Sequence, residues 1–132
     1  MIKPVIVVVT YNRPNSLKRL LNSLQNAEYE FNDVTLIISI DHQDSDNHNE
    51  VVRLANEFDW VYGEKKIIEH KKKLGLKAHV LCCGDLVNKF NSIIMLEDDL
   101  FVSPSFYTYT AEALSFYGDD NNIGGISLYN HK

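Results

Sequence analysis

The sequence predicts an α/β fold, a three-layer sandwich around a mostly parallel sheet, formed by one domain that spans residues 1–132. Three observations support this prediction. Continuous apolar runs, typical of strands buried on both faces, alternate along the chain with amphipathic helical patterns. A length of 132 residues is enough for one hydrophobic core and too short for two. The sequence also has no internal repeat, linker or low-complexity stretch.

The first half of the chain predicts two strands, each followed by a helix. The strands are Val5–Val9, an unbroken β-branched run, and Val34–Ile40, which ends on Asp41. The first helix is indicated by four leucines spaced at helical intervals, Leu17, Leu20, Leu21 and Leu24. The second helix is predicted to begin near Asp46 and to direct inward Val51, Leu54, Ala55 and Phe58.

The middle of the chain contains shorter elements. Trp60–Tyr62 and Lys66–Glu69 each fit a short strand. A helical stripe follows, made of Leu76, Val80, Cys83, Val87 and Phe90. Ser92–Leu96 then forms a further apolar strand that runs directly into three acidic residues.

The last predicted helix begins at Ser103 and Pro104, because serine is a preferred N-cap and proline a preferred first residue. Its inward side is predicted to carry Phe106, Tyr109, Ala113 and Phe116 or Tyr117. Gly118 and residues 119–122 are expected to end this helix, before a last strand at Ile123–Leu128.

Polar residues follow three of the predicted strands. Thr10–Arg13 follow the first strand, Asp41–Asp44 the second, and Glu97–Asp99 the strand at Ser92–Leu96. In an open parallel sheet the ligand crevice lies outside the carboxyl ends of the strands, so these segments are expected to share one edge. The substrate-binding residues predicted at this edge are Thr10, Asn12, Arg13, Asp41, Glu97 and Asp98.

The acidic triplet Glu97, Asp98 and Asp99 is the strongest candidate for metal chemistry. Three carboxylates so close together repel one another unless a cation neutralises them. Mg²⁺ and Mn²⁺ are typically held by one or two carboxylates together with substrate phosphates. The triplet therefore predicts a metal–diphosphate site, and its alternative is a solvated acidic turn.

Two other residues at this edge have candidate roles. A carboxylate such as Asp41 can accept the N3–H of uracil or a ribose hydroxyl, whereas many aspartates at strand ends only cap the backbone. Arg13 can pair bidentately with a phosphate, or it can be an ordinary exposed loop arginine. Both alternatives stay open at the level of the residues.

Four segments resemble those of known sugar-transferring enzymes. Pro4–Pro14 resembles the opening strand and loop of GT-A glycosyltransferases, and Ile94–Phe106 is similar to the EDDLxxxPxFF signature of the N-acetylglucosaminyltransferase I-like family. Ile38–Asp41 resembles that family's second strand, and Gly125–Asn130 the strand after its metal-site helix. The resemblance covers nearly the whole chain in the right order and implies a GT-A (nucleotide-diphospho-sugar transferase) fold.

The resemblance also implies roles for individual residues. Asp99 would coordinate Mn²⁺ or Mg²⁺ bridging the diphosphate of a nucleotide-sugar donor, which the resemblance implies to be a UDP-sugar. Glu97 and Asp98 would contact the sugar or ribose side of the donor. Arg13 would lie near the phosphates and Asp41 would bind the nucleoside. The family has a helix histidine that touches uracil, and His79 lies at about the corresponding position. The alternative for His79 is a structural role.

The activity implied is transfer of a hexosyl or N-acetylhexosaminyl group, with inversion, to a glycan or lipid-linked acceptor. The resemblance places the general base beyond Lys132, so we expect a domain truncated at its C-terminus that binds donor and transfers sugar weakly or not at all. One alternative is a non-catalytic nucleotide-sugar-binding or assembly module. Another is a sugar-phosphate nucleotidyltransferase, which needs a glycine-rich loop that Tyr11–Asn15 does not provide.

Charge and composition restrict partners and location. A net charge of −5 and a pI near 5.4 argue against a nucleic-acid partner. No apolar run approaches the roughly 20 residues that span a bilayer, and no signal-peptide pattern is present. Cys82 and Cys83, neighbours in a predicted helix, are interpreted as core thiols of a reduced, cytoplasmic protein. The sequence leaves the oligomeric state open.

Each of two polar segments has both a functional and a structural interpretation. The lysine-rich stretch Lys65–Lys77 either flanks the diphosphate or meets anionic lipid peripherally at a membrane, or it is a solvated loop and helix face. Four residues, His42, Asp44, Asp46 and His48, either form a second metal site or lead as a polar loop into a helix cap.

Overall fold

The computed structural model describes residues 3–29, 33–90, 92–116 and 125–127. It contains a five-stranded sheet in the order β3-β2-β1-β4-β5, with every neighbouring pair parallel. The strands are β1 (Val5–Thr10), β2 (Leu36–Ile40), β3 (Lys65–Glu69), β4 (Ile93–Glu97) and β5 (Gly125–Ser127). The helices are α1 (Pro14–Gln25), α2 (Asp46–Glu57), α3 (Leu76–Gly84), α4 (Val87–Phe90) and α5 (Phe106–Phe116).

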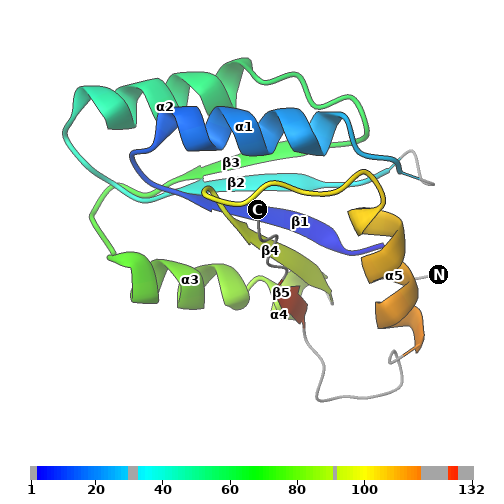
Figure 1. Ribbon diagram of the computed structural model, residues 1–132. Helices are drawn as coiled ribbons and strands as arrows, with labels where there is room; N and C mark the ends of the chain where they lie inside the picture. Colours follow the sequence, from blue (N-terminus) through cyan, green and yellow to red (C-terminus); the bar gives the residue numbers. More distant parts are fainter. Residues whose placement is uncertain (1–2, 30–32, 91, 117–124, 128–132) are drawn as a thin grey trace.

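The helices cover both faces of the sheet, with α1 and α2 on one face and α3 and α4 on the other (Figure 1). This arrangement confirms the predicted three-layer α/β sandwich. The predicted parallel strands are confirmed as well, with β2 beginning at Leu36 rather than Val34 and β3 beginning at Lys65. None of the described helices is long and apolar enough to cross a membrane.

The central strand β1 explains why its sequence is apolar without interruption. Ile6 and Val8 belong to the larger core cluster, on the side of α1 and α2. Val5, Val7 and Val9 belong to a second cluster on the side of α3 and α4. Side chains alternate between the two faces of a strand, so a strand covered on both faces needs an apolar residue at every position.

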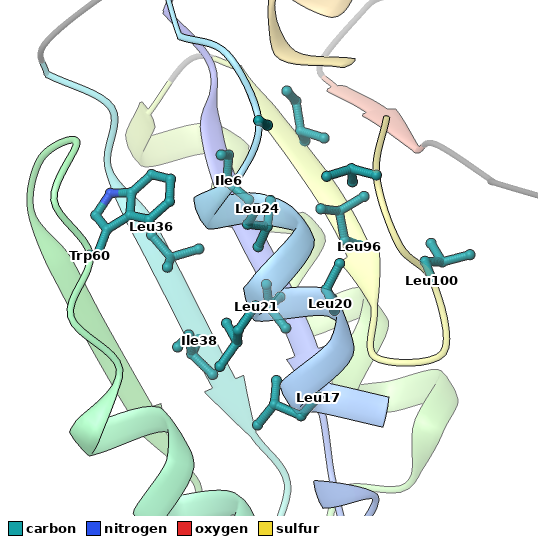
Figure 2. Packing of buried hydrophobic residues seen from close by; sticks show 14 of the residues in the cluster. Ile6, Leu17, Leu20, Leu21, Leu24, Leu36, Ile38, Trp60, Leu96 and Leu100 are labelled. Atoms are coloured by element: carbon teal, nitrogen blue, oxygen red, sulfur yellow. The ribbon is translucent and has the colours of Figure 1, made fainter. Parts of the chain in front are cut away.

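The predicted leucine stripe of α1 forms the centre of the larger cluster. Leu17, Leu20 and Leu24 are fully buried and Leu21 is nearly so. Figure 2 shows these leucines lying over the sheet, close to Ile6, Ile38 and Leu96. The predicted inward side of α2 is also confirmed, since Val51 and Ala55 are buried and Leu54 and Phe58 pack against the same cluster.

After β4 the chain runs back across the α1 side of the sheet before it forms α5 (Figure 1). Leu100 and Val102 in this connection enter the core, and the amide of Val102 donates to Ser23 Oγ at 3.1 Å. Just after this connection, in the first turn of α5, the hydroxyl of Tyr107 donates to the carbonyl of Pro4 at 2.8 Å. These contacts fix β4, and therefore the acidic residues that follow it, relative to α1.

The prediction for α5 was wrong in its phase. The helix begins at Phe106, and Ser103 and Pro104 lie in the turn before it. The buried residues of the helix are Phe106, Tyr107, Thr110, Ala111 and Leu114, whereas Tyr109 is 71% exposed. Tertiary contacts set the inward face, because the Tyr107 hydroxyl bonds to Pro4 and its ring packs against Tyr29, and this places Tyr107 rather than Tyr109 in the core.

Two other predictions in the middle of the chain were wrong. Trp60–Tyr62 is a loop, held because the Trp60 indole donates to the carbonyl of Val34 at 2.7 Å and because Tyr29 packs against both aromatic rings. The single stripe from Leu76 to Phe90 is divided between α3 and α4 by a tight turn, where the amide of Leu86 bonds back to Cys83.

Individual burial predictions in α3 need correction too. Leu76 is 68% exposed because it lies at the first turn, beyond the edge of the sheet. Cys83 is a buried thiol, whereas Cys82 is exposed and is not a core residue. Gly118, residues 119–122 and the ends of the predicted last strand lie outside the described residues, while β5 falls within that strand.

Candidate functional site

A cleft of about 370 Å³ opens at the carboxyl ends of β1, β2 and β4, beside the start of α3. We call it the strand-end cleft. Its lining consists of Val9, Thr10, Tyr11, Asn12, Arg13, Asp41, Lys73, Gly75, Leu76, His79, Glu97 and Asp98. All seven side chains predicted to bind substrate are therefore brought together in one cleft, as the shared edge of a parallel sheet requires.

Asp98 ties the ends of β1 and β4 together inside this cleft. Its Oδ1 lies 2.8 Å from a guanidinium nitrogen of Arg13, and its Oδ2 accepts a hydrogen bond from the Thr10 hydroxyl at 3.0 Å. The Asp98 side chain is 3% exposed and that of Arg13 is 57% exposed. Burial raises the pKa of Asp98, and the charge of Arg13 and the bond from Thr10 oppose this rise. Arg13 keeps an exposed part that can meet an anion.

Asp41 holds the segment that leads into α3. The amides of His42 and Leu74 donate to its Oδ1 at 2.8 and 2.7 Å, and the amide of Gly75 donates to its Oδ2 at 3.0 Å. Burial alone would raise the pKa of Asp41, but these hydrogen bonds hold it below its usual value. A carboxylate has about four lone-pair positions, so one position on Oδ2 stays available to a ligand.

Gly75 meets this carboxylate in a backbone conformation that only glycine adopts easily. Its φ is +82°, and it is the N-cap residue of α3. A residue with a Cβ would be strained at this angle. The Asp41–Gly75 contact therefore fixes where α3 begins and, with it, where Lys73 and His79 lie in the cleft.

His79 forms the floor of the cleft and is almost fully buried. Its Nε2 lies 2.8 Å from Ser39 Oγ, which is also 3.1 Å from Nε2 of His70. A single hydroxyl proton can serve only one of the two imidazoles, so the other must donate its own N–H to Ser39. Burial and the nearby His70 lower the pKa of His79. His79 is therefore a neutral imidazole at pH 7, and its predicted helical position is correct.

Asn12, Asp99 and Glu97 differ in how they are held and in whether they reach the cleft. The amide of Asn12 donates to Gln43 Oε1 at 2.9 Å, which connects the loop after β1 with the loop after β2. Asp99 is exposed and does not line the cleft, although it directly follows Asp98. Glu97 is half-buried and does line the cleft.

The carboxylate oxygens available near the cleft suit a metal ion that the protein coordinates only in part. Within the described residues, no group of three or more His, Cys, Asp or Glu side chains could hold a metal ion. Asp98 is engaged with Arg13 and Thr10, which leaves Glu97 and Asp99 as carboxylates with free oxygens next to the cleft. One or two carboxylates completed by phosphate oxygens is the usual arrangement for Mg²⁺. The residues present therefore fit a metal–diphosphate group.

For the segment near His42, the sequence allowed either a second metal site or a polar loop leading into a helix cap, and the structure has a helix cap. Ser45 is the N-cap of α2, and its hydroxyl accepts the amide of His48 at 3.1 Å. His42 lies 3.5 Å from Asp44, and its ring packs against that of His48 at 5.6 Å between centroids. The structure thus supports the polar loop and cap for these four residues.

The sequence interpretation did not single out two residues that line the cleft, although one of them, Lys73, belongs to the stretch that it placed near the diphosphate. Tyr11 has a buried hydroxyl without a hydrogen-bond partner in the described structure. Lys73 places its ammonium group 5.6 Å from the centroid of the Tyr11 ring. Tyr11 could have been found from its place between Thr10 and Asn12. Lys73 could not, because nothing in a run of lysines distinguishes the one that a turn directs into a cleft.

Comparison with known proteins agrees with this site. Residues 5–132 match the model of the family named Glycosyl transferase family 2. The chain therefore belongs to glycosyl transferase family 2, which confirms the expected glycosyltransferase domain. Membership does not extend to the narrower resemblance to N-acetylglucosaminyltransferase I-like enzymes, which is not confirmed. No curated protein matches the chain in sequence.

Solved structures show the same fold. The crystal structure of S. aureus TarS superimposes with a TM-score of 0.63 at 14% identity, over 87% of this chain and 20% of TarS. The structure of TarS 1–349 in complex with UDP gives a TM-score of 0.63 at 15% identity, over 89% of this chain and 33% of that one. The chain thus spans a third or less of these two structures, and at this identity the likeness concerns the fold alone.

Proposed function

We propose that the strand-end cleft binds a nucleotide-diphosphate sugar, specifically a UDP-sugar, and that the domain serves transfer of its hexosyl or N-acetylhexosaminyl group to a glycan or lipid-linked acceptor. The observation that supports this most directly is the convergence of Arg13, Asp41 and Glu97 from three strand ends in one cleft. Membership of glycosyl transferase family 2 favours this reaction over nucleotidyl transfer. The TarS fragment crystallised with UDP supports uridine as the nucleoside.

Each cleft residue has a role in this proposal. The free lone pair of Asp41 Oδ2 accepts the N3–H of uracil or a ribose hydroxyl, and the neutral His79 faces the base from the cleft floor. The exposed part of Arg13 and the ammonium group of Lys73 contribute positive charge for the phosphates. Glu97 accepts a hydroxyl of the sugar or ribose. Asp98 acts by holding Arg13 and Thr10 in place.

A divalent cation, Mn²⁺ or Mg²⁺, belongs to the same proposal, with Asp99 as its protein ligand. When bound, it supplies positive charge that stabilises the diphosphate leaving group. In the transfer itself, the acceptor oxygen forms a bond to the anomeric carbon as the bond between that carbon and the diphosphate oxygen breaks. UDP leaves with the electron pair, and the acceptor proton passes to a general base.

Calorimetric titration tests the donor site. UDP and UDP-N-acetylglucosamine are titrated into the wild-type chain with Mn²⁺, with Mg²⁺ and with EDTA, and into Asp99→Ala. We expect binding that needs the cation and that weakens at least about tenfold, or about 1.4 kcal/mol, in the variant. The matched control is Asp59→Ala, which removes an exposed carboxylate far from the cleft lining.

The outcomes separate the parts of the proposal. Equal binding with the cation and with EDTA would reject the metal and keep the nucleotide site. A folded wild-type chain that binds neither nucleotide would reject the donor site and favour the non-catalytic module. An equal loss in Asp59→Ala would show that the effect of Asp99→Ala is unspecific.

A further inference from the structure

The segment Lys71–Cys82 gives the molecule a local charge opposite to that of the rest of the chain. It contains four of the 13 Lys and Arg and none of the 18 Asp and Glu. The remainder therefore holds nine basic residues against all 18 acidic ones. We call the exposed side of this segment, which comprises the connection after β3 and most of α3, the α3 surface.

The α3 surface also carries apolar side chains in contact with solvent. Leu74, Leu76 and Leu81 are 37%, 68% and 61% exposed, and the other large apolar residues exposed to this degree within the described chain are Val61 and Tyr109. Lys71, Lys72 and Lys77 are exposed and make no ion pair with any described residue. Unpaired positive charge and exposed leucine thus occur on the same segment.

The orientation of α3 places these residues on its outer side. His79 and Cys83, four residues apart, are buried against the sheet. Lys77 and Leu81, also four residues apart, are both exposed and so form the opposite stripe. Figure 1 shows that α3 is an outer element, with no described helix covering it on the side away from the sheet.

We propose that the α3 surface docks on an anionic lipid membrane. Lysines near an anionic bilayer are attracted to its headgroups, and leucines next to them can enter the interface, which is the pattern of peripheral amphipathic segments. A second copy of this chain fits less well, because four lysines would face four lysines. Single-stranded nucleic acid fits less well too, because Lys71–Cys82 contains no Phe, Tyr or Trp on which a base could stack and its one imidazole, His79, is buried.

The position of the α3 surface connects it with the strand-end cleft. Lys73, Gly75 and Leu76 belong both to the segment and to the lining of the cleft. Docking through this surface brings the mouth of the cleft to the lipid headgroups, where a lipid-linked acceptor lies. The docking itself does not depend on donor binding, so it can be tested separately from the proposed function.

Co-sedimentation with vesicles tests the docking. The wild-type chain is mixed with vesicles of phosphatidylcholine alone and of phosphatidylcholine with phosphatidylglycerol. We expect binding to the anionic vesicles that is lost in high salt. The double variant Lys72→Gln/Lys77→Gln should weaken it about 25-fold, at about fivefold for each lysine. Leu81→Ser should weaken it about tenfold, since a leucine that leaves water contributes that much.

The matched control is Lys18→Gln/Arg19→Gln, which removes the same charge from the exposed side of α1 on the other face of the sheet. Its vesicle binding should equal that of the wild type. Circular dichroism and UDP titration should be unchanged in every variant, because none of the changed residues lines the cleft. No sedimentation of the folded wild type, an equal loss in the α1 control, or binding to heparin without binding to vesicles would overturn the proposal.

Discussion

Arg13 and Asp98 join the ends of β1 and β4 through a contact of 2.8 Å between guanidinium and carboxylate. Because the other oxygen of Asp98 accepts the Thr10 hydroxyl, this carboxylate is engaged on both sides. The acidic triplet is thus divided by function. Asp98 holds the ends of β1 and β4 together, and Glu97 and Asp99 keep oxygens that can face a ligand.

This division predicts different effects for two neighbouring substitutions. Asp98→Ala leaves the buried Thr10 hydroxyl without its acceptor and Arg13 without its partner, and we expect the free energy of unfolding to fall by about 1–3 kcal/mol. Asp99→Ala changes an exposed carboxylate and should alter stability by less than about 0.5 kcal/mol. Urea denaturation of the three proteins measures both. Equal stability of the two variants would contradict the division.

The hydroxyl of Tyr107 provides a second prediction, about the anchoring of α5. It donates to the carbonyl of Pro4 at 2.8 Å from a fully buried position. Tyr107→Phe leaves that carbonyl without this donor, so we expect a loss of about 1–2 kcal/mol in the free energy of unfolding. Tyr109→Phe, the same change at an exposed ring, should cost nothing measurable. If both variants unfold like the wild type, the Tyr107–Pro4 bond does not stabilise α5.

Much of the fold could be predicted because a parallel sheet covered on both faces leaves a strong pattern. Every residue of Val5–Val9 must be apolar for the two clusters to form, and the leucines of α1 recur at helical spacing. The candidate site followed from the same pattern, since parallel strands end at one edge. Thr10, Asp41 and Glu97 needed no further information to be placed together.

The rest depended on contacts between residues distant in the sequence. Trp60 is β-prone, but its indole is drawn to the Val34 carbonyl and to the ring of Tyr29, so tertiary contacts override local preference. The inward face of α5 depended on the contacts of Tyr107 with Pro4 and Tyr29, which lie far away in the sequence. The inward turn of Lys73 depended on the bonds from Leu74 and Gly75 to Asp41, which no local pattern reveals.

Gly63 marks another long-range contact and gives a third prediction. A Cβ at this position would lie 2.3 Å from the carbonyl oxygen of Val34 and 2.7 Å from its amide nitrogen. Because backbone cannot move aside cheaply, Gly63→Ala should lower the free energy of unfolding by about 2–4 kcal/mol. Gly84→Ala is the matched control: its Cβ would meet Met95 at 3.8 Å, and alanine favours the helix by up to about 1 kcal/mol. The thermal unfolding midpoint should therefore fall in Gly63→Ala and rise in Gly84→Ala.

Because the pKa of Asp41 is lowered in the folded state, we expect the free energy of unfolding to decrease at acidic pH. The hydrogen bonds from Leu74, His42 and Gly75 keep the folded-state pKa below the unfolded value of about 3.9. Asp41 therefore contributes its full stabilisation above pH about 4, and this contribution is lost as the pH falls toward the folded-state pKa. Urea midpoints measured between about pH 6 and pH 3 should fall less steeply in Asp41→Asn, which starts from a lower stability. The control Asp59→Asn, a change at an exposed carboxylate, should keep the wild-type dependence of the urea midpoint on pH. If Asp41→Asn also keeps that dependence, the hydrogen bonds to Asp41 do not stabilise the folded chain.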